Sequence, residues 1–409
     1  MFIKRILGSL VAASIIAGAI AGPEGKKNND TATPDNNLAP IKDPKGSKVV
    51  EGSYIVVYKS DATLPKSDVT SQAIKKGLKR TYNFKGFKGF SGKFDDETLN
   101  KIRADPAVAF VERDGIMSIN AEVQNGAPWG LARISHREKL NTNTQDKFIY
   151  DVNGGQGVTA YVIDTGILTN HPEFEGRARW GATFADDGDE DGNGHGTHVA
   201  GTIGSKTYGV AKKVKLVAVK VLGSDGTGYN SDIIAGINWA ANDQKKNPKN
   251  KSVANLSLGG TASDAVDNAV KGAVAAGLHV VVAAGNSNSD ACKFSPARES
   301  TSITVGGSDI NDAKYKSGNY GKCVDIIAPA VNVLSTWNDG KTKAITGTSM
   351  ATPHVAGIIA QFLTTKVRDP ASMKEYITSI ASKGKITGYG NDTVNLLAFN
   401  TLESAAQAA

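Results

Sequence analysis

Three short segments supply an acid, a base and a nucleophile, in the chain order Asp, His, Ser. Asp164 lies in Val-Ile-Asp-Thr-Gly, His195 in Gly-His-Gly-Thr-His, and Ser349 in Gly-Thr-Ser-Met-Ala-Thr-Pro. A serine hydroxyl is a weak nucleophile at neutral pH unless an imidazole accepts its proton, and a carboxylate orients that imidazole and stabilises its charged form. These residue types therefore predict a serine hydrolase.

Other interpretations of these segments fit less well. Asp187–Gly192 matches half of an EF-hand loop, but the twelfth position is His198, where a glutamate is needed. His195 and His198 could face one side of a helix as metal ligands, yet no glutamate stands at the metalloprotease position. Gly347–Ala351 nearly fits an esterase nucleophile elbow, which requires a final glycine and the order Ser, Asp, His. We therefore expect residues 187–192 to form a solvated acidic loop and His198 to pack in support of the site.

The segments lie in a region where apolar runs alternate with helical patterns. The expected strands are Val158–Ile163, Leu216–Val221, Val253–Leu256 and His279–Ala284. The expected helices are His195–Ile203, Ile233–Asn242, Ala265–Ala276 and Met350–Phe362. This alternation predicts an α/β fold, a doubly wound, mainly parallel sheet with helices on both faces, which binds ligands at the carboxyl ends of its strands. Asp164 falls at such an end.

Two of the candidates fall at predicted helix starts, where backbone N–H groups lack partners and favour negative charge. Ser349 directly precedes its helix, and Pro353 fits a first turn whose amides have no acceptor to lose. Asn286 follows a predicted strand and could donate to the oxyanion that forms on an attacked carbonyl. We therefore expect an oxyanion hole built from Asn286 and Ser349.

The first fifty residues predict export followed by a linker. Lys4 and Arg5 precede an apolar run that ends in Ala-Ile-Ala, as in a secretory signal peptide over residues 1–21. The run is shorter than the roughly 20 residues of a spanning helix, so we expect no membrane anchor in the mature protein. Residues 22–50 are polar and rich in Pro, Asn and Lys, which predicts a flexible linker.

A small α+β module is expected over residues 51–121, before a larger domain over 122–409. Its predicted strands are Tyr54–Tyr58, Gly89–Phe94 and Ala107–Glu112. Its predicted helices are Ser67–Leu78 and Asp95–Ile102. The segment Ala121–Gly126 has the composition of a loop.

Composition limits the possible partners. The 409 residues are 40% hydrophobic and 21% charged, which fits a globular protein of more than one domain. The net charge is +7, but the basic residues are scattered and no aromatic-interleaved stripe accompanies them, so nucleic-acid binding is not expected. An exported protein favours pairing of its two cysteines, Cys292 and Cys323, and two free buried thiols are the alternative.

The three segments, their order and Ala-Ala-Gly-Asn at residues 283–286 resemble the subtilisin superfamily of serine proteases, and most closely its fungal proteinase K and cerevisin group. The likeness covers residues 127 to about 362, and residues 54–120 resemble the inhibitory propeptide of that family. It implies a self-processed serine endopeptidase that forms an acyl-enzyme, with the acid, base and nucleophile above as its triad. A non-catalytic binding protein on the same scaffold would lack one of these groups, and none is missing.

The resemblance also implies how a substrate would bind. Members of the family bind a peptide as an added strand between two segments of the enzyme. Backbone hydrogen bonds then contribute more to recognition than side chains do, which gives broad specificity. The first specificity pocket would have a small, uncharged floor, so aromatic or aliphatic residues are expected before the cut and dibasic sites are disfavoured. The residues carried over are Gly226, Thr227, Gly228, Ser257, Leu258 and Gly259 for the edges, and Ala283, Ala284 and Gly285 for the floor.

Maturation follows from the resemblance as well. The enzyme would cut its own propeptide away between Ala121 and Glu122. Before that cut the propeptide would act as an intramolecular inhibitor. The mature chain would act on protein and peptide substrates, without a cofactor for catalysis, as a monomer. Its destination would be extracellular, or alternatively the vacuolar lumen.

Two structural features complete what the resemblance implies. Cys292 and Cys323 would form a cerevisin-type disulfide. Asp325 and the carbonyl groups of Ser300 and Ser302 would bind a structural calcium, since hard oxygen ligands suit that ion. The alternative is that Asp325 is an ordinary loop acid.

Overall fold

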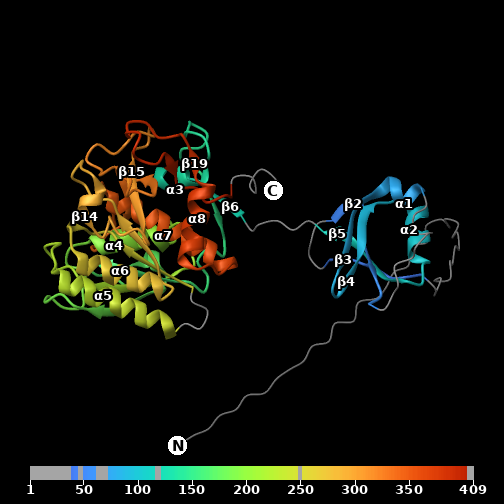
Figure 1. Cartoon of the computed structure of the whole chain (residues 1–409), viewed down its shortest axis with the longest axis horizontal. Coiled ribbons are helices and arrows are strands. Elements are labelled where there is room, and N and C mark those ends of the chain that lie inside the picture. Colours follow the sequence, from blue (N-terminus) through green and yellow to red (C-terminus); the bar gives the residue numbers. More distant parts are fainter. Residues whose placement is uncertain (1–37, 45–48, 61–71, 116–120, 247–250, 403–409) are drawn as a thin grey trace, which may run out of the picture. The chain divides into compact units, whose positions relative to one another are not determined.

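The computed structural model describes residues 38–44, 49–60, 72–115, 121–246 and 251–402. The chain divides into two compact units between residues 117 and 118, and the sequence colours of Figure 1 distinguish them. The predicted signal peptide, residues 1–21, lies outside the described residues. Each unit has its own sheet and its own hydrophobic core.

The N-terminal unit is a five-stranded sheet with two helices, in agreement with the predicted α+β module. The strand order is β1-β5-β2-β4-β3, in which β1 is parallel to β5 and the other neighbours are antiparallel. The core of the unit includes Val56, Phe90, Leu99 and Val111. The elements are β1 (Ile41–Lys42), β2 (Val49–Tyr58), α1 (Gln72–Gly77), β3 (Leu78–Phe84), β4 (Phe87–Lys93), α2 (Asp96–Arg103) and β5 (Val108–Gly115).

Two strands of this unit depart from the prediction. Ile41 and Lys42 form β1 beside β5, so the flexible linker expected up to residue 50 ends earlier. Ala39 and Ile41 pack against the core, and the Lys42 ammonium lies 3.7 Å from the centre of the Phe110 ring. Strand β3 is nearly all exposed and gives no alternating apolar pattern. Both edge strands therefore depend on pairing with a neighbour rather than on a local signal.

The second unit is built on a nine-stranded, mainly parallel sheet. Its order is β19-β20-β16-β15-β13-β11-β8-β10-β9, and only β19 is antiparallel to its neighbour. The winding direction reverses between β8 and β11, and ligands bind beyond the carboxyl ends of strands at such a point. The strands are β8 (Thr159–Asp164), β9 (Ala178–Thr183), β10 (Lys215–Lys220), β11 (Ser252–Leu256), β13 (His279–Ala283), β15 (Ile303–Ser308), β16 (Ile326–Pro329), β19 (Ser382–Lys383) and β20 (Leu396–Leu397).

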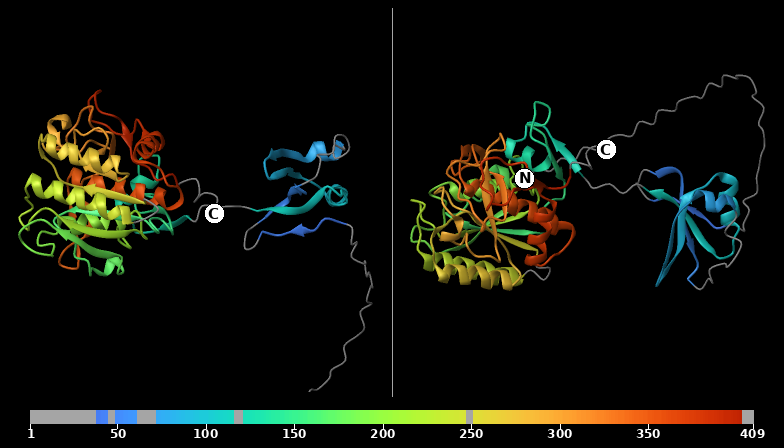
Figure 2. Two further views of the ribbon diagram at one scale, coloured as in Figure 1. Left: turned by 60° about the horizontal axis from the view of Figure 1, so that its bottom comes forward. Right: turned by 45° about the horizontal axis from the view of Figure 1, so that its top comes forward.

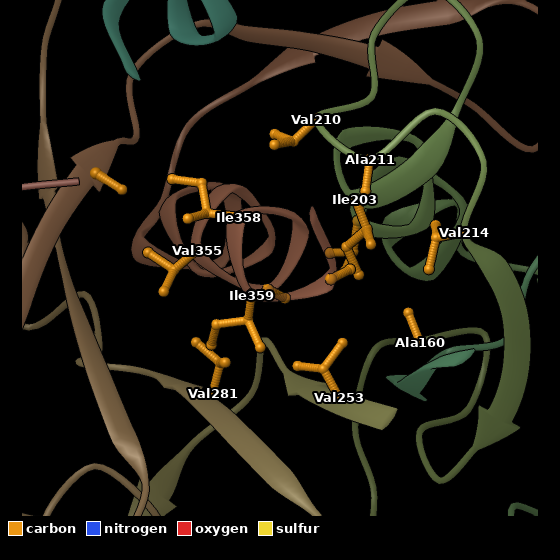
Figure 3. Close-up of a cluster of buried hydrophobic side chains, with 14 of the residues drawn as sticks. Ala160, Ile203, Val210, Ala211, Val214, Val253, Val281, Val355, Ile358 and Ile359 are labelled. Carbon is orange, nitrogen blue, oxygen red and sulfur yellow. The ribbon is translucent and has the colours of Figure 1, made fainter. Parts of the chain in front are cut away.

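Helices cover both faces of this sheet, as Figure 2 shows. They are α4 (His195–Gly204), α5 (Asn230–Asp243), α6 (Asp264–Ala275) and α7 (Thr348–Thr365). α4 and α7 share one buried cluster, and α5 and α6 share a second cluster on the other face. Figure 3 shows Val355 and Ile359 of α7 among Ile203 of α4 and the strand residues Val253 and Val281. The predicted fold class is therefore confirmed, with the predicted strands and helices in place.

One segment predicted as a loop is a strand. β6 (Ala121–Gln124) pairs antiparallel with β7 (Phe148–Asp151). The Tyr150 hydroxyl of β7 donates to the Glu122 carboxylate of β6 at 2.9 Å. The sequence of β6 is too short and too polar to indicate a strand, so its order comes from β7.

Shorter elements complete the second unit. They are α3 (Trp129–Ser135), β12 (Gly260–Thr261) paired with β14 (Phe294–Ser295), β17 (Val333–Thr336) paired with β18 (Thr342–Ile345), and α8 (Pro370–Ile380). Cys292 and Cys323 form the expected disulfide, with their Cα atoms 5.4 Å apart. Within the described ranges, we find no helix with the length and apolar character needed to span a membrane.

Candidate active site

A cleft of about 680 Å³ lies beyond the carboxyl ends of β8, β11 and β13. His195, Ser349 and Asn286 line it, although they come from distant parts of the chain. None of the described residues that line the cleft is Asp, Glu, Lys or Arg. All residues predicted to bind substrate line it as well: Gly226, Thr227, Gly228, Ser257, Leu258, Gly259, Ala283, Ala284 and Gly285.

Asp164 is fully buried at the end of β8 and holds the imidazole of His195. Its Oδ1 atom lies 2.7 Å from His195 Nδ1 and accepts the backbone N–H of Thr165 at 2.8 Å. The His195 side chain is 25% exposed. Burial lowers the pKa of His195, but the charge of Asp164, its hydrogen bond and the charge of Asp191 together outweigh burial and raise the pKa above the usual 6.5. With Nδ1 hydrogen-bonded to the carboxylate, Nε2 is the basic nitrogen of the neutral ring.

Asp191, which the sequence did not single out, fixes the segment in front of α4. Its carboxylate accepts the backbone N–H groups of Gly194 and Thr197 at 2.8 and 2.9 Å, and the hydroxyl of Thr165 at 2.8 Å. It therefore satisfies free amides at the start of α4 and ties that helix to the end of β8. The solvated acidic loop predicted from the sequence is wrong for Asp191, which is 8% exposed.

Lys220 supports the same region from the neighbouring strand. It lies opposite Asp164 in the register of β10 and β8 and is fully buried. Its ammonium group donates to the carbonyls of Thr165 and Leu222 at 2.9 and 3.0 Å and pairs with Asp187 at 3.0 Å. These three contacts use all three donors of the lysine and hold the turn after β8 in place.

Ser349 is the second residue of α7 rather than the residue before the helix. Among the described residues its hydroxyl has one hydrogen bond, which it donates to the carbonyl of Ser257 at 3.0 Å. Pro353 lies inside α7, not in a first turn, and has no N–H to donate to the Ser349 carbonyl. The hydroxyl of Ser257 donates to that carbonyl instead, at 2.7 Å. Ser257 therefore contacts both the side chain and the backbone of Ser349.

The side-chain amide of Asn286 and the backbone nitrogen of Ser349 lie near each other beside Gly347. The backbone N–H of Thr348 donates to Asn286 Oδ1 at 2.9 Å, which leaves Nδ2 as the free end of the amide. A Cβ atom on Gly347 would lie 3.5 Å from Asn286 Nδ2 and 3.7 Å from the backbone nitrogen of Ser349. The Asn286 amide and the backbone nitrogen of Ser349 therefore both lie close to Gly347.

A second asparagine, Asn319, shapes the floor of the cleft and was not predicted. It is fully buried, donates to the carbonyl of Ala284 at 2.8 Å and accepts the N–H of Ser287 at 2.9 Å. Gly285, between them, has a φ of +101°, and a Cβ atom there would lie 2.4 Å from Asn319 Nδ2. Glycine is therefore required at this position. The partners of Asn319 lie 35 and 32 residues away along the chain, so no local pattern indicates the role.

His198 packs behind the site, as expected. Its Nε2 atom faces the carbonyl oxygens of Val333 and Lys343 at 2.9 and 3.1 Å and must carry a proton to bond them. Burial lowers the pKa of His198 to about 4, so the ring is neutral. In the parts of the chain that the structure describes, no group of three or more His, Cys, Asp or Glu residues could hold a metal ion.

The three predicted calcium ligands do meet, but around a lysine. Lys374 of α8 donates to the carbonyls of Ser300 and Ser302 at 2.8 and 2.7 Å and pairs with Asp325 at 2.8 Å. Calcium binds about six to eight oxygen atoms, whereas these three oxygen atoms already bind an ammonium group. In this structure the three predicted ligands hold an ammonium group, so calcium is not shown at this site.

Known proteins resemble both units. Residues 155–395 match the subtilase family, and residues 53–120 match the peptidase inhibitor I9 family. The chain is 46% identical to subtilisin-like protease 8 of Arthroderma benhamiae, over 89% of this chain and 84% of that protein. It is 44% identical to the subtilisin-like serine protease Pen ch 18 of Penicillium rubens, over 89% of this chain and 83% of that protein.

A solved structure supports the same assignment. The crystal structure of a cold-adapted subtilisin-like serine proteinase matches with a TM-score of 0.62 and 46% identity, over 67% of this chain and 98% of that one. The match agrees with the mainly parallel sheet and with a cleft lined by serine and histidine. By sequence and by fold, the chain belongs to the subtilase family of serine endopeptidases and carries an I9 inhibitor domain as its propeptide.

Proposed function

We propose that Ser349 is the nucleophile of this endopeptidase, His195 its general base, and Asp164 the residue that orients the imidazole. The observation that carries the proposal is the 2.7 Å contact between Asp164 Oδ1 and His195 Nδ1 beside a cleft that Ser349 also lines. Burial of Asp164 strengthens this interaction, because few water molecules screen a fully buried carboxylate. The pair can then accept a proton from a hydroxyl that reaches Nε2.

The reaction begins when the Ser349 hydroxyl leaves the carbonyl of Ser257. Catalytic hydrogen bonds often form only when substrate is bound, so this resting contact is compatible with attack. The hydroxyl gives its proton to His195 Nε2 as its oxygen bonds to the substrate carbonyl carbon. His195 then protonates the leaving amine, the C–N bond breaks, and an acyl-enzyme remains. Water, activated by the same imidazole, hydrolyses the ester and restores Ser349.

The two donors beside Gly347 would stabilise the tetrahedral intermediate. We predict that Asn286→Ala lowers kcat by about a hundred- to a thousand-fold, because one donor to the developing negative charge is lost. KM should change little, since the donor acts mainly in the transition state. Steady-state hydrolysis of a short peptide substrate measures both constants.

Asn230→Ala is a matched control, because Asn230 lines the same cleft and is exposed at the start of α5. It should leave kcat nearly unchanged. If Asn286→Ala lost as much turnover as Ser349→Ala, the role of Asn286 as an oxyanion donor would be excluded.

We further propose broad specificity with a preference for apolar or aromatic residues before the cut. Ala283, Ala284 and Gly285 offer a small floor, and the described lining of the cleft carries no acidic side chain. The segments 226–228 and 257–259 border the cleft and can pair with the backbone of an extended peptide. An uncharged pocket and backbone pairing can accept many peptide sequences, so the enzyme can cleave many protein substrates.

Digestion of a peptide library by the purified enzyme tests both mechanism and specificity. Cuts should follow aromatic and large aliphatic residues and should be rare after pairs of basic residues. A covalent serine reagent should stop all cleavage. Cleavage that survives complete modification of Ser349 would overturn the mechanism, whereas a preference for basic residues would overturn only the specificity.

Maturation is proposed to follow the same chemistry. We propose a signal peptide at 1–21, an I9 propeptide ending at 121 and a catalytic domain from 122, with the enzyme cutting between Ala121 and Glu122. Neither residue lines the cleft, and both lie in β6, paired with β7. β6 must therefore separate from β7 when this bond is cut. The paired cysteines support an oxidising destination, outside the cell or in a vacuole.

A further inference from the structure

Lys374 makes a saturated set of contacts away from the cleft. Its three ammonium donors are used by Ser300 O at 2.8 Å, Ser302 O at 2.7 Å and Asp325 Oδ2 at 2.8 Å. The Lys374 and Asp325 side chains are only 23% and 21% exposed. A lysine on an ordinary surface keeps its ammonium group in water. Here three oxygen atoms of the protein bind the ammonium group instead, so they form a cation site that Lys374 fills.

The oxygen atoms are held in position by contacts that do not involve the lysine. The Glu299 carboxylate accepts the backbone N–H groups of Thr301 and Ser302 at 2.9 and 3.1 Å, which fixes the turn that presents the two carbonyls. The Thr304 N–H donates to Asp325 Oδ2 at 2.9 Å. Glu299 is itself only 8% exposed. The turn is therefore already shaped to bind a cation.

Helix α8 delivers the lysine from a rigid support. Met373 and Ile377, on either side of Lys374, are buried in the core of the second unit. The carboxylate of Asp369 caps the helix by accepting the N–H of Ser372 at 2.9 Å. Since α8 is fixed at its first turn and along its apolar side, the ammonium group is held close to its three acceptors with little loss of side-chain freedom on binding.

We propose that Lys374 is a built-in cation that takes the place of calcium between the turn 299–302 and Asp325. The positive charge of the lysine pairs with the carboxylate of Asp325, while the carboxylate of Glu299 is bonded to backbone N–H groups of its own turn. A divalent ion would find these oxygen atoms already bonded and would face the repulsion of an ammonium group. Calcium therefore does not bind here in the natural chain, and removal of the lysine head group opens the site to it.

The site also braces the wall of the active-site cleft. Phe294, Pro296 and Ala297 line the cleft and directly precede the turn. The Thr304 hydroxyl, on the strand that follows the turn, donates to the carbonyl of Ala297 at 2.8 Å. Lys374 thus supplies a covalently attached positive charge, in place of a calcium ion that could dissociate, next to the segment that lines the cleft.

Thermal unfolding with and without calcium tests the proposal. The purified enzyme, inactivated with a covalent serine reagent to prevent self-digestion, is melted in excess EDTA or in millimolar calcium. Asp325→Asn should show the same calcium-dependent change in Tm as the wild type, because the wild-type site holds no calcium. If the wild type gained stability from calcium and Asp325→Asn did not, the proposal would be overturned.

Lys374→Met provides the converse test, since it keeps the apolar stem and removes the charge. Its Tm in EDTA should fall by roughly 2 °C, the shift that a loss of about 1 kcal/mol causes in a domain of this size. Calcium should restore the loss with a dissociation constant on the order of 10⁻⁴ to 10⁻³ M, as expected for a site with few protein ligands.

Lys385→Met is the matched control, because Lys385 pairs with the exposed Glu138 at 2.7 Å and contacts no carbonyl cluster. It should show no calcium response beyond that of the wild type. A calcium titration by calorimetry should likewise show one additional bound ion for Lys374→Met only. If Lys374→Met gained neither stability nor a bound ion from calcium, the oxygen atoms would not form a cation site. The proposal would then be rejected.

Discussion

Ser349→Ala is expected to lower kcat for peptide hydrolysis by about a million-fold, the loss that removal of the catalytic serine causes in a related protease. Without the hydroxyl, His195 has no proton to accept and no acyl-enzyme forms. The variant should still hydrolyse peptides faster than water alone does, because substrate binding in the cleft and the donors of Asn286 and the backbone remain. Steady-state hydrolysis of a peptide substrate measures kcat, with the enzyme concentration determined by a method that does not require an active enzyme.

The same variant should accumulate as the uncut chain if the enzyme processes itself. N-terminal sequencing of wild-type protein should give Glu122 as the first residue, and Ser349→Ala should retain the propeptide. Ser231→Ala, at an exposed position of α5, is the control and should be processed normally. Normal processing of a correctly folded Ser349→Ala would show that another protease makes the cut, and normal turnover would exclude Ser349 as nucleophile.

Asp164→Asn is expected to lower kcat by about ten-thousand-fold. Asp164 Oδ1 accepts a hydrogen bond from His195 Nδ1 at 2.7 Å, and this fixes the tautomer whose Nε2 can accept a proton. An amide can donate to Nδ1 instead and so stabilise the tautomer with the proton on Nε2, which cannot act as a base. Asp186→Asn, at an exposed position, is the control and should keep normal activity.

The pH profile of the same pair of enzymes separates a catalytic effect from a structural one. Burial lowers the pKa of His195, but Asp164, with a smaller contribution from the charge of Asp191, raises the pKa above 6.5. His195 must be neutral to act as a base, so kcat/KM should rise with pH through a midpoint above 6.5. In Asp164→Asn the charge of Asp164 is lost, while burial still lowers the pKa of His195 and the charge of Asp191 still raises it, so the midpoint should move to lower pH. An unchanged midpoint would contradict the assigned role of Asp164.

The stability of the fold should change with pH in the opposite sense. A histidine whose folded pKa is raised stabilises the native state when protonated. This contribution from His195 is therefore complete below its unfolded pKa and is lost as pH rises through its folded pKa. Enzyme activity and this part of the stability thus depend on opposite protonation states of the same imidazole.

The sequence by itself determined the fold class and the main strands and helices, and it indicated the residues that we propose carry the chemistry. Asp164 ends a continuous apolar run, which marks a buried parallel strand, and Ser349 stands next to the apolar run that forms most of α7. These signals are local, because hydrophobic periodicity and the chain order of acid, base and nucleophile can be read within short windows. The predicted cleft residues followed from the family resemblance and are all found at one cleft.

Only the tertiary structure decided which polar groups hold that site together. Asp191, Lys220 and Asn319 look in the sequence like a loop acid, a strand-end lysine and a loop amide, yet each is buried and hydrogen-bonded. The contacts of Lys374 were equally hidden from the sequence, since its carbonyl acceptors lie 72 and 74 residues earlier in the chain. A buried polar group must find partners, but its sequence neighbourhood does not say which. Those partners are chosen by the packing of distant elements, so they become known only when the chain has folded.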